Sequence, residues 1–391
     1  MKLRRFWVLL HRYTGLAMTL FLIIVGFTGC LLAFFKELDG AINPKFLVPV
    51  QSGTLLDPVT LIETIERIDP SVKADAVWLT KNAATVSASP QQTINELGYD
   101  QLILNPYTGE LLGKRHWGDL SQGLENLMPF IYKLHYELAL GEIGVWILGI
   151  TALIWTLDCF VGFYLTLPAA KPERSSDISL QHRTFWQRWR LSWLIKWSAS
   201  KNRITFDLHR AGGLWLWLAL LVFAWSSVYM NLAGVYNKVM QSVTEYHQPW
   251  SDFPDLPQPV QQPNISWRQA QAIAQVELTH LSQTQGIKML ATSGLWINRS
   301  KGFYVYDTKS NADIQDQGGN TRIVIDANSG EVKQVLLPTG QYAGNTITSW
   351  LLALHTANIW GLPYKIFVSA LGLVIVMLAV TGVLIWLKKR R

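Results

Sequence analysis

Residues 135–162 read HYELALGEIGVWILGITALIWTLDCFVG, and residues 355–382 repeat their plan of a histidine, a glycine-containing step and a long apolar run. Aligned without a gap, Gly162 falls on Gly382. The segments that precede them also match, with HRYTG at 11–15 and HRAGG at 209–213. A duplicated unit of helix, domain and helix accounts for both matches.

Four apolar runs are each long enough to cross a hydrocarbon core of about 30 Å as a helix. They cover approximately residues 6–35, 143–168, 211–233 and 366–387. The predicted fold class is therefore a membrane α-helical protein with four transmembrane helices in two repeats. Cys30 and Cys159 both fall within apolar runs, so a disulfide between the outer domains is not expected.

The formal net charge of +7 is unevenly distributed along the chain. Most of the excess lies in the C-terminal tail and in the loop 169–204, which contains Lys171, Arg174, Arg183, Arg188, Arg190, Lys196, Lys201 and Arg203. Basic loops stay in the cytoplasm, so both termini and this loop are predicted to be cytoplasmic. The charge then reflects membrane topology, and no nucleic acid is expected as a partner.

The two segments between the helices predict small α+β domains. In the first, Asp57-Pro58 opens an amphipathic helical pattern and NPYTGE at 105–110 predicts a hairpin turn. In the second, a helix follows Ser266 and DANSGE at 326–331 is the matching turn. The basic loop contains Trp186, Trp189, Trp193 and Trp197, a spacing that predicts an amphipathic helix in contact with membrane lipid.

The predicted organisation has seven parts. They are transmembrane helix 1 (1–36), a first outer domain (37–123), an outer amphipathic segment with transmembrane helix 2 (124–168), the basic loop (169–204), transmembrane helix 3 (205–233), a second outer domain (234–345), and an amphipathic segment with transmembrane helix 4 and the tail (346–391).

Four histidines occupy repeat-related places beside these helices. His11 and His209 are expected near the cytoplasmic face, and His135 and His355 near the outer face. Each pair can hold one planar cofactor between helices, as helical bundles do when they bind haem. Zinc would need four converging ligands, copper or non-haem iron would need nearby Met, Cys or carboxylates, and c-type haem would need C-x-x-C-H. Two molecules of haem b, each bound by two histidines, fit this pattern best.

Other residues near the histidines are open to two interpretations. Gly15 and Gly213 follow His11 and His209 by one turn, and could admit a porphyrin edge or serve helix packing. Arg12 and Arg210 could pair with haem propionates or simply reflect the positive-inside rule. Asp158 lies within an apolar run without an identifiable partner, and a buried protonated or hydrogen-bonded acid is the default expectation.

With these motifs in order and duplicated, nearly the whole chain resembles the PepSY-associated transmembrane helix family of iron-regulated membrane proteins. The hairpin turns depart mildly from the family's DPxTGE-like pattern, with Asn105 and Ser329 in place of Asp and Thr. The resemblance implies PepSY-like outer domains and carries the haem-ligand role onto His11, His135, His209 and His355.

The resemblance also implies a function. It suggests an inner-membrane oxidoreductase, with periplasmic outer domains, that reduces ferric siderophores in the periplasm. The electron donor would be a quinol or a cytoplasmic reductant. Two alternatives stay open: a quinol-linked b-type cytochrome that donates electrons to a periplasmic protein, and a non-redox protease inhibitor or sensor of the PepSY type. Because Lys133, Lys238 and Lys365 are scattered in the sequence, we expect an open haem edge without a siderophore-specific pocket.

Overall fold

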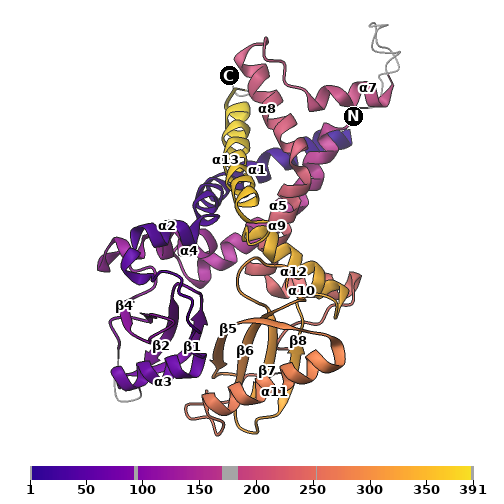
Figure 1. Cartoon of the computed structure of the whole chain (residues 1–391). Helices are drawn as coiled ribbons and strands as arrows, with labels where there is room; N and C mark the ends of the chain where they lie inside the picture. The colour runs from indigo at the N-terminus through magenta and orange to yellow at the C-terminus, as the bar shows by residue number, and fades with distance from the viewer. Residues whose placement is uncertain (1, 92–95, 170–183, 252, 389–391) are drawn as a thin grey trace, which may run out of the picture.

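The protein consists of a helical bundle joined to a part that contains all of the β-strands that the structure describes (Figure 1). The computed structural model describes residues 2–91, 96–169, 184–251 and 253–388. Both termini lie at the end of the bundle away from the strands, which we call the far end; the other end is the sheet side (Figure 1).

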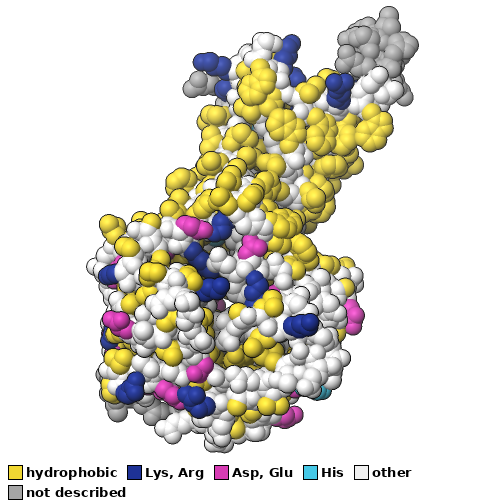
Figure 2. Space-filling model, in the orientation of Figure 1, with side chains coloured by type: hydrophobic (Ala, Val, Ile, Leu, Met, Phe, Trp, Pro, Cys, Tyr) yellow, Lys and Arg dark blue, Asp and Glu magenta, His cyan; other side chains and the backbone are white. Residues whose placement is uncertain are grey.

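Three helices of the described chain are each long and apolar enough to cross a membrane by themselves. They are α1 (Lys2–Leu32), α5 (Glu142–Thr166) and α13 (Gly361–Lys388). Figure 2 shows apolar side chains covering the bundle, with Lys and Arg gathered at its far end and on the sheet-bearing part. This distribution is that of a multi-pass membrane protein, because lipid accepts apolar surface and excludes charge.

The third predicted membrane helix is broken into two. Helices α8 (Lys201–Trp215) and α9 (Trp217–Asn231) meet at Leu216 with a bend of 70°, and the pair is a fourth candidate span if it crosses the membrane as one broken helix. The tryptophans on either side of the bend are held by different elements: Trp215 Nε1 donates to the Trp193 carbonyl, and Trp217 Nε1 donates to the Cys159 carbonyl.

Close packing between α1 and α13 depends on two glycines. A Cβ added at Gly26 would lie 2.9 Å from the Gly372 carbonyl oxygen, and one added at Gly372 would lie 2.5 Å from the Gly26 carbonyl oxygen. Small residues are the common way in which membrane helices approach each other closely. Helix α1 belongs to the first repeat and α13 to the second, so the two repeats pack directly against each other within the bundle.

The amphipathic segments expected at 124–140 and 346–358 are the short helices α4 (Leu127–Glu137) and α12 (Ala343–His355). Each is followed by a turn with left-handed residues, at Leu138, Ala139 and Gly141 in one repeat and at Ala357, Trp360 and Gly361 in the other. Because of these turns, α4 and α12 do not continue in the direction of the membrane helices α5 and α13 that follow them. Helices α2 (Phe35–Ile42) and α10 (Ala233–Val243) follow α1 and α9.

The two outer domains form one continuous antiparallel sheet. The strands lie in the order β4-β3-β2-β1-β5-β6-β7-β8, and β1 pairs with β5 across the boundary between the repeats, as Val77 opposite Leu295 illustrates. Their bounds are β1 Val72–Leu79, β2 Ala84–Pro90, β3 Gln101–Leu104, β4 Leu111–Arg115, β5 Met289–Asn298, β6 Phe303–Ser310, β7 Thr321–Asp326 and β8 Val332–Leu336. The two predicted outer domains are therefore joined edge to edge through β1 and β5.

One helix from each repeat packs on the sheet. Helix α3 (Pro58–Ile68) begins where the Asp57 carboxylate accepts hydrogen bonds from the Val59 and Thr60 amides, and α11 (Trp267–Gln285) begins with a capping box at Ser266. Ile62 of α3 and Ala274 of α11 are fully buried in the same apolar core, together with strand residues of both repeats. This shared core explains why the sheet does not divide.

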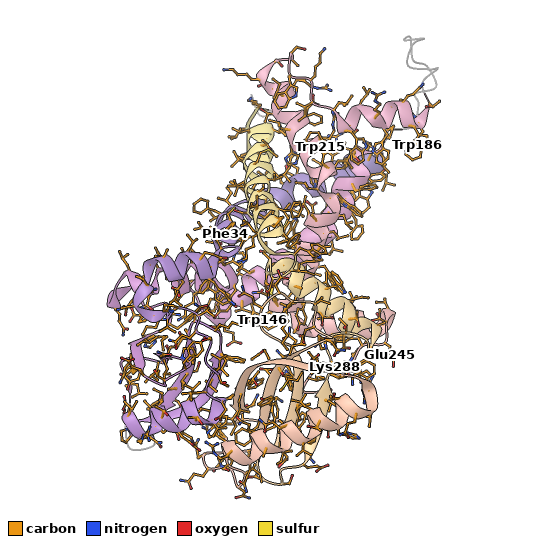
Figure 3. The ribbon with its side chains drawn as sticks, in the orientation of Figure 1. Phe34, Trp146, Trp186, Trp215, Glu245 and Lys288 are labelled. Atoms are coloured by element: carbon orange, nitrogen blue, oxygen red, sulfur yellow. The ribbon has the colours of Figure 1, made fainter. Side chains whose placement is uncertain are left out.

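The tryptophan-rich segment of the basic loop does not form the long amphipathic helix expected from its spacing. It contains one helical turn, α7 (Phe185–Trp189), then a 3₁₀ turn (Arg190–Trp193). Arg210 donates hydrogen bonds to the Leu191 and Leu194 carbonyls, which a continuing helix would have used. Trp186 and Trp215 lie at the far end (Figure 3). The loop residues Lys171, Arg174 and Arg183 and the tail residues 389–391 lie outside the described residues.

Candidate cofactor site

The fold brings the four predicted histidines together as two pairs, each with one member from each repeat. In the far pair, the ring centres of His11 on α1 and His209 on α8 lie 6.0 Å apart, with ring planes inclined by 63°. In the sheet-side pair, the ring centres of His135 on α4 and His355 on α12 lie 6.3 Å apart, inclined by 67°. Two imidazoles that bind opposite sides of one metal, through bonds of about 2.0–2.1 Å, have ring centres roughly 6.3 Å apart.

The two pairs lie at different depths. His135 contacts Thr28 of α1, which is seventeen residues after His11 on the same helix. At 1.5 Å per residue the two pairs are separated along α1 by about 25 Å, slightly less than the hydrocarbon core of about 30 Å. One pair therefore lies toward each end of the bundle.

All four imidazoles use Nδ1 to hold their position. His11 Nδ1 lies 2.9 Å from an Asp158 carboxylate oxygen, and His209 Nδ1 lies 3.0 Å from the Leu378 carbonyl oxygen. His135 Nδ1 and His355 Nδ1 lie 2.9 Å and 2.7 Å from the hydroxyl oxygens of Thr28 and Ser226.

These partners also determine the tautomer. The Thr28 hydroxyl donates to the Ile24 carbonyl, and the Ser226 hydroxyl donates to the Phe223 carbonyl, so each hydroxyl accepts from its histidine. The Leu378 carbonyl can only accept. Nδ1 therefore carries the hydrogen in these rings, which leaves the Nε2 lone pair available as a ligand. Metal-binding histidines characteristically have such a partner on the second nitrogen.

A cavity of about 480 Å³ surrounds the far pair. Its lining includes both histidines, Gly15, Gly213, Arg12 and Arg210, so it contains all of the sequence-predicted residues of this half of the site. The volume lies within the range of small-molecule and cofactor sites, about 300–1,000 Å³.

Four glycines shape this cavity. A Cβ at Gly15 would meet nothing within 4 Å, and one at Gly213 would meet only the Leu378 side chain at 3.9 Å, so both positions border open space. Gly162 and Gly382 lie against the histidines instead, because a Cβ there would be 3.5 Å from His11 Cε1 and 3.4 Å from His209 Cε1. The repeat thus provides room for a flat ligand and support for each imidazole.

The two predicted arginines differ in their surroundings. Arg210 pairs with the buried Asp207 carboxylate, yet its Nε is buried and has no hydrogen-bond partner. Arg12 forms no ion pair with any residue that the structure describes. A cavity that holds an unpaired guanidinium and an unsatisfied N–H donor fits an anionic ligand, since such groups are strong partners for carboxylates. These observations, with the glycine-lined space, fit the propionates and the ring of a haem.

Asp158 has a partner that the sequence did not identify. Its carboxylate accepts from His11 Nδ1 and from the Thr14 hydroxyl, at 2.9 Å and 3.2 Å, so the expectation of a buried, hydrogen-bonded acid is correct. In the repeat alignment Asp158 falls on Leu378. Leu378 contacts His209 just as Asp158 contacts His11, so the repeat alignment could have linked Asp158 to a histidine.

Thr28 and Ser226 were missed by the sequence analysis. Both positions are seventeen residues after the HR histidine of their repeat, and both carry a hydroxyl. Hydroxyl residues in membrane helices usually bond to their own backbone, which makes them unremarkable in a sequence. Their repeat-related spacing was the only signal available.

Among the residues that the structure describes, no group of three or more His, Cys, Asp or Glu side chains is positioned to hold a metal ion. Each histidine pair thus offers two nitrogen ligands. That number suits a metal whose other ligands belong to a macrocycle.

Lys365, one of the three lysines considered in the sequence, belongs to a group with two lysines that the sequence analysis did not name. Lys365 pairs with Glu37, whose neighbour Lys36 donates to the Gln317 side chain, and Lys309 donates to the Asp316 carbonyl. Figure 2 shows Lys and Arg side chains beside a hollow between the two halves of the sheet-bearing part. Three lysines from distant segments therefore gather around residues 316–317 and α2.

None of the curated proteins matches this chain. The family model described as the PepSY-associated TM region matches residues 8–389, which includes both histidine pairs and both halves of the sheet. The chain therefore belongs to the PepSY-associated transmembrane family.

Proposed function

We propose that the protein is a di-haem membrane oxidoreductase that reduces ferric siderophores in the periplasm and releases Fe(II). The observation that carries this proposal is the pairing of four histidines, with ring centres 6.0 Å and 6.3 Å apart and every Nδ1 already engaged. Haem b, when bound, supplies reversible one-electron transfer.

The residues of the chain have distinct parts in this proposal. The four histidines hold the two cofactors, while Asp158, Leu378, Thr28 and Ser226 keep the rings oriented. Gly15 and Gly213 leave room for the porphyrin, and Arg12 and Arg210 receive its propionates. The surrounding apolar helices exclude water and ions, which limits loss of electrons to side reactions.

The proposed substrate follows from the chemistry of iron. Siderophores hold Fe(III) with hard oxygen ligands, and reduction to Fe(II) weakens that hold. The lysines around residues 316–317 would attract an anionic chelate toward the sheet-side pair. The far pair would receive electrons from a quinol or a cytoplasmic reductant.

The experiment is a reduced-minus-oxidised absorbance spectrum of the purified full-length protein, followed by anaerobic addition of chemically different ferric siderophores to the reduced protein. We expect a b-type haem spectrum, two haems per chain, and reoxidation coupled to Fe(II) release. Absence of haem after expression with adequate haem supply would leave the non-redox inhibitor or sensor. Haem that ferric siderophores do not reoxidise would favour the quinol-linked cytochrome.

A further inference from the structure

The four histidines differ in what accepts the hydrogen on Nδ1. His11 alone donates to a carboxylate, that of Asp158. His209 donates to the Leu378 carbonyl, with the Thr381 hydroxyl at 3.1 Å. On the sheet side, both acceptors are hydroxyls. The two repeats therefore differ at this position next to the histidines, which carries Asp158 in the first repeat and Leu378 in the second.

The Asp158 carboxylate is buried and lies close enough to His11 to influence its imidazole. Its side chain is 10 % exposed, and its two oxygens lie 2.9 Å and 3.0 Å from the same Nδ1. Its other contact is the Thr14 hydroxyl, and no Lys or Arg forms an ion pair with it within the described ranges. The imidazole of His11 is thus the closest hydrogen-bond donor to the Asp158 carboxylate.

A carboxylate on Nδ1–H makes the imidazole a stronger electron donor than a neutral acceptor does. Electron donation to iron, together with a nearby negative charge in a medium of low dielectric constant, stabilises the oxidised ion more than the reduced ion. The result is a lower reduction potential. The sheet-side histidines have only the hydroxyls of Thr28 and Ser226, whose hydrogens already bond to their own helices.

We propose that Asp158 is a positioning residue that lowers the reduction potential of the far haem below that of the sheet-side haem. This inference rests on the proposed function. One electron lost at the far site is gained at the sheet-side site, so the difference in potential favours transfer toward the sheet side. The quinol or cytoplasmic reductant would supply the next electron at the far site, and the ferric chelate would take its electron at the sheet side.

The test is a spectroelectrochemical titration of full-length protein, as wild type and as Asp158→Asn. The two waves are assigned with His135→Ala, which lacks a sheet-side ligand. Asn keeps the shape and can still accept from His11, but carries no charge. We expect the far-haem potential to rise by about 59 mV or more, a tenfold change in the equilibrium constant for one-electron reduction, while the sheet-side potential stays unchanged.

Two further variants separate charge from structure. Thr381→Val leaves the Leu378 carbonyl as the acceptor for His209, so neither potential should move appreciably. Thr28→Asp places a carboxylate next to His135 with little change in size, and should lower the sheet-side potential.

Several results would overturn the inference. An Asp158→Asn protein with both haems and unchanged potentials would show that the carboxylate has no electrical role, while the di-haem function would stand. Loss of the far haem in both Asp158→Asn and Asp158→Ser would make Asp158 a structural requirement instead. If the wild-type protein binds no haem, the proposed function itself fails, which is a distinguishable outcome.

Discussion

The ring centre of His135 lies 6.3 Å from that of His355, although the two residues belong to different repeats and neither lies on a membrane-crossing helix. Each sits near the end of a short helix whose chain then turns through left-handed residues. His11 and His209 approach across the repeats in the same way. Both candidate sites therefore exist only when the two repeats are assembled.

Replacement of one histidine should remove one haem of two. His11→Ala or His209→Ala should empty the far site, and His135→Ala or His355→Ala the sheet-side site, because the pairs are about 25 Å apart along α1. The measurement is haem content by pyridine haemochrome assay on purified protein. Replacement of His280, which is exposed on α11, is the control. Loss of both haems from a folded single variant would contradict the independence of the sites.

A larger side chain at Gly15 should block the far site. Because a Cβ at Gly15 meets nothing within 4 Å and Gly15 lines the cavity, Gly15→Leu would place its side chain in cavity space. We expect loss of the far haem with unchanged helical circular dichroism. Ala17→Leu, at an exposed position of the same helix, is the matched control. Full haem content in Gly15→Leu would mean that the cavity does not hold the ring.

The junction between β1 and β5 should tolerate no side chain at Gly294. A Cβ there would lie 2.6 Å from the Val77 carbonyl oxygen and 2.7 Å from the Trp78 ring. Gly294→Val should destabilise the junction by about 1–3 kcal/mol, as overpacking does. Hydrogen exchange should become faster in β1 and β5, whereas Gly98→Ala, with open space around it, should leave exchange unchanged. If β1 and β5 exchanged hydrogen equally slowly in Gly294→Val and Gly98→Ala, the result would argue against one continuous sheet.

The first half of the sheet should lose stability in acid. A hydrogen bond from Lys114, with others from Ser71 and Tyr99, holds the pKa of Asp69 well below its ordinary value. Because the pKa is lower in the folded state, this stabilisation is complete above the unfolded value of about 3.9 and is lost as the pH falls below it.

Asp69→Asn should therefore cost about 1.5–3 kcal/mol at neutral pH, the usual range for hydrogen bonds to a charged group. The variant should also show a weaker pH dependence below about pH 4. Thermal unfolding followed by hydrogen exchange in β3 and β4, at neutral and acidic pH, measures both effects. Glu110→Gln, an exposed acid in the adjacent turn, serves as the control. If Asp69→Asn lost as much stability in acid as the wild type does, Asp69 would not be the source of the acid sensitivity.

Membrane orientation can be tested with introduced cysteines, because Cys30 and Cys159 are both buried. An impermeant thiol reagent added to intact spheroplasts should label Asn311→Cys, which is exposed at the end of β6, and not Ser198→Cys at the far end. The reverse pattern would place the sheet in the cytoplasm and contradict periplasmic reduction.

Much of the architecture could be predicted because it depends on local sequence. The length and apolarity of residues 143–168 and 366–387 predict membrane helices regardless of what surrounds them. Asp57-Pro58 and Ser266 mark helix starts through hydrogen bonds to the next few amides. The duplication itself identified the four histidines and the two hairpins.

Only the tertiary structure decided how these pieces combine. Pairing of β1 with β5, the bend at Leu216, the contact of Asp158 with His11 and the hydroxyl partners Thr28 and Ser226 join residues far apart in the chain. Periodicity and spacing report which face of an element is apolar, and they carry no information about its neighbour. The duplicated sequence predicted which histidines form each pair, whereas packing between the two repeats determined the ring-centre distances of 6.0 Å and 6.3 Å within the pairs.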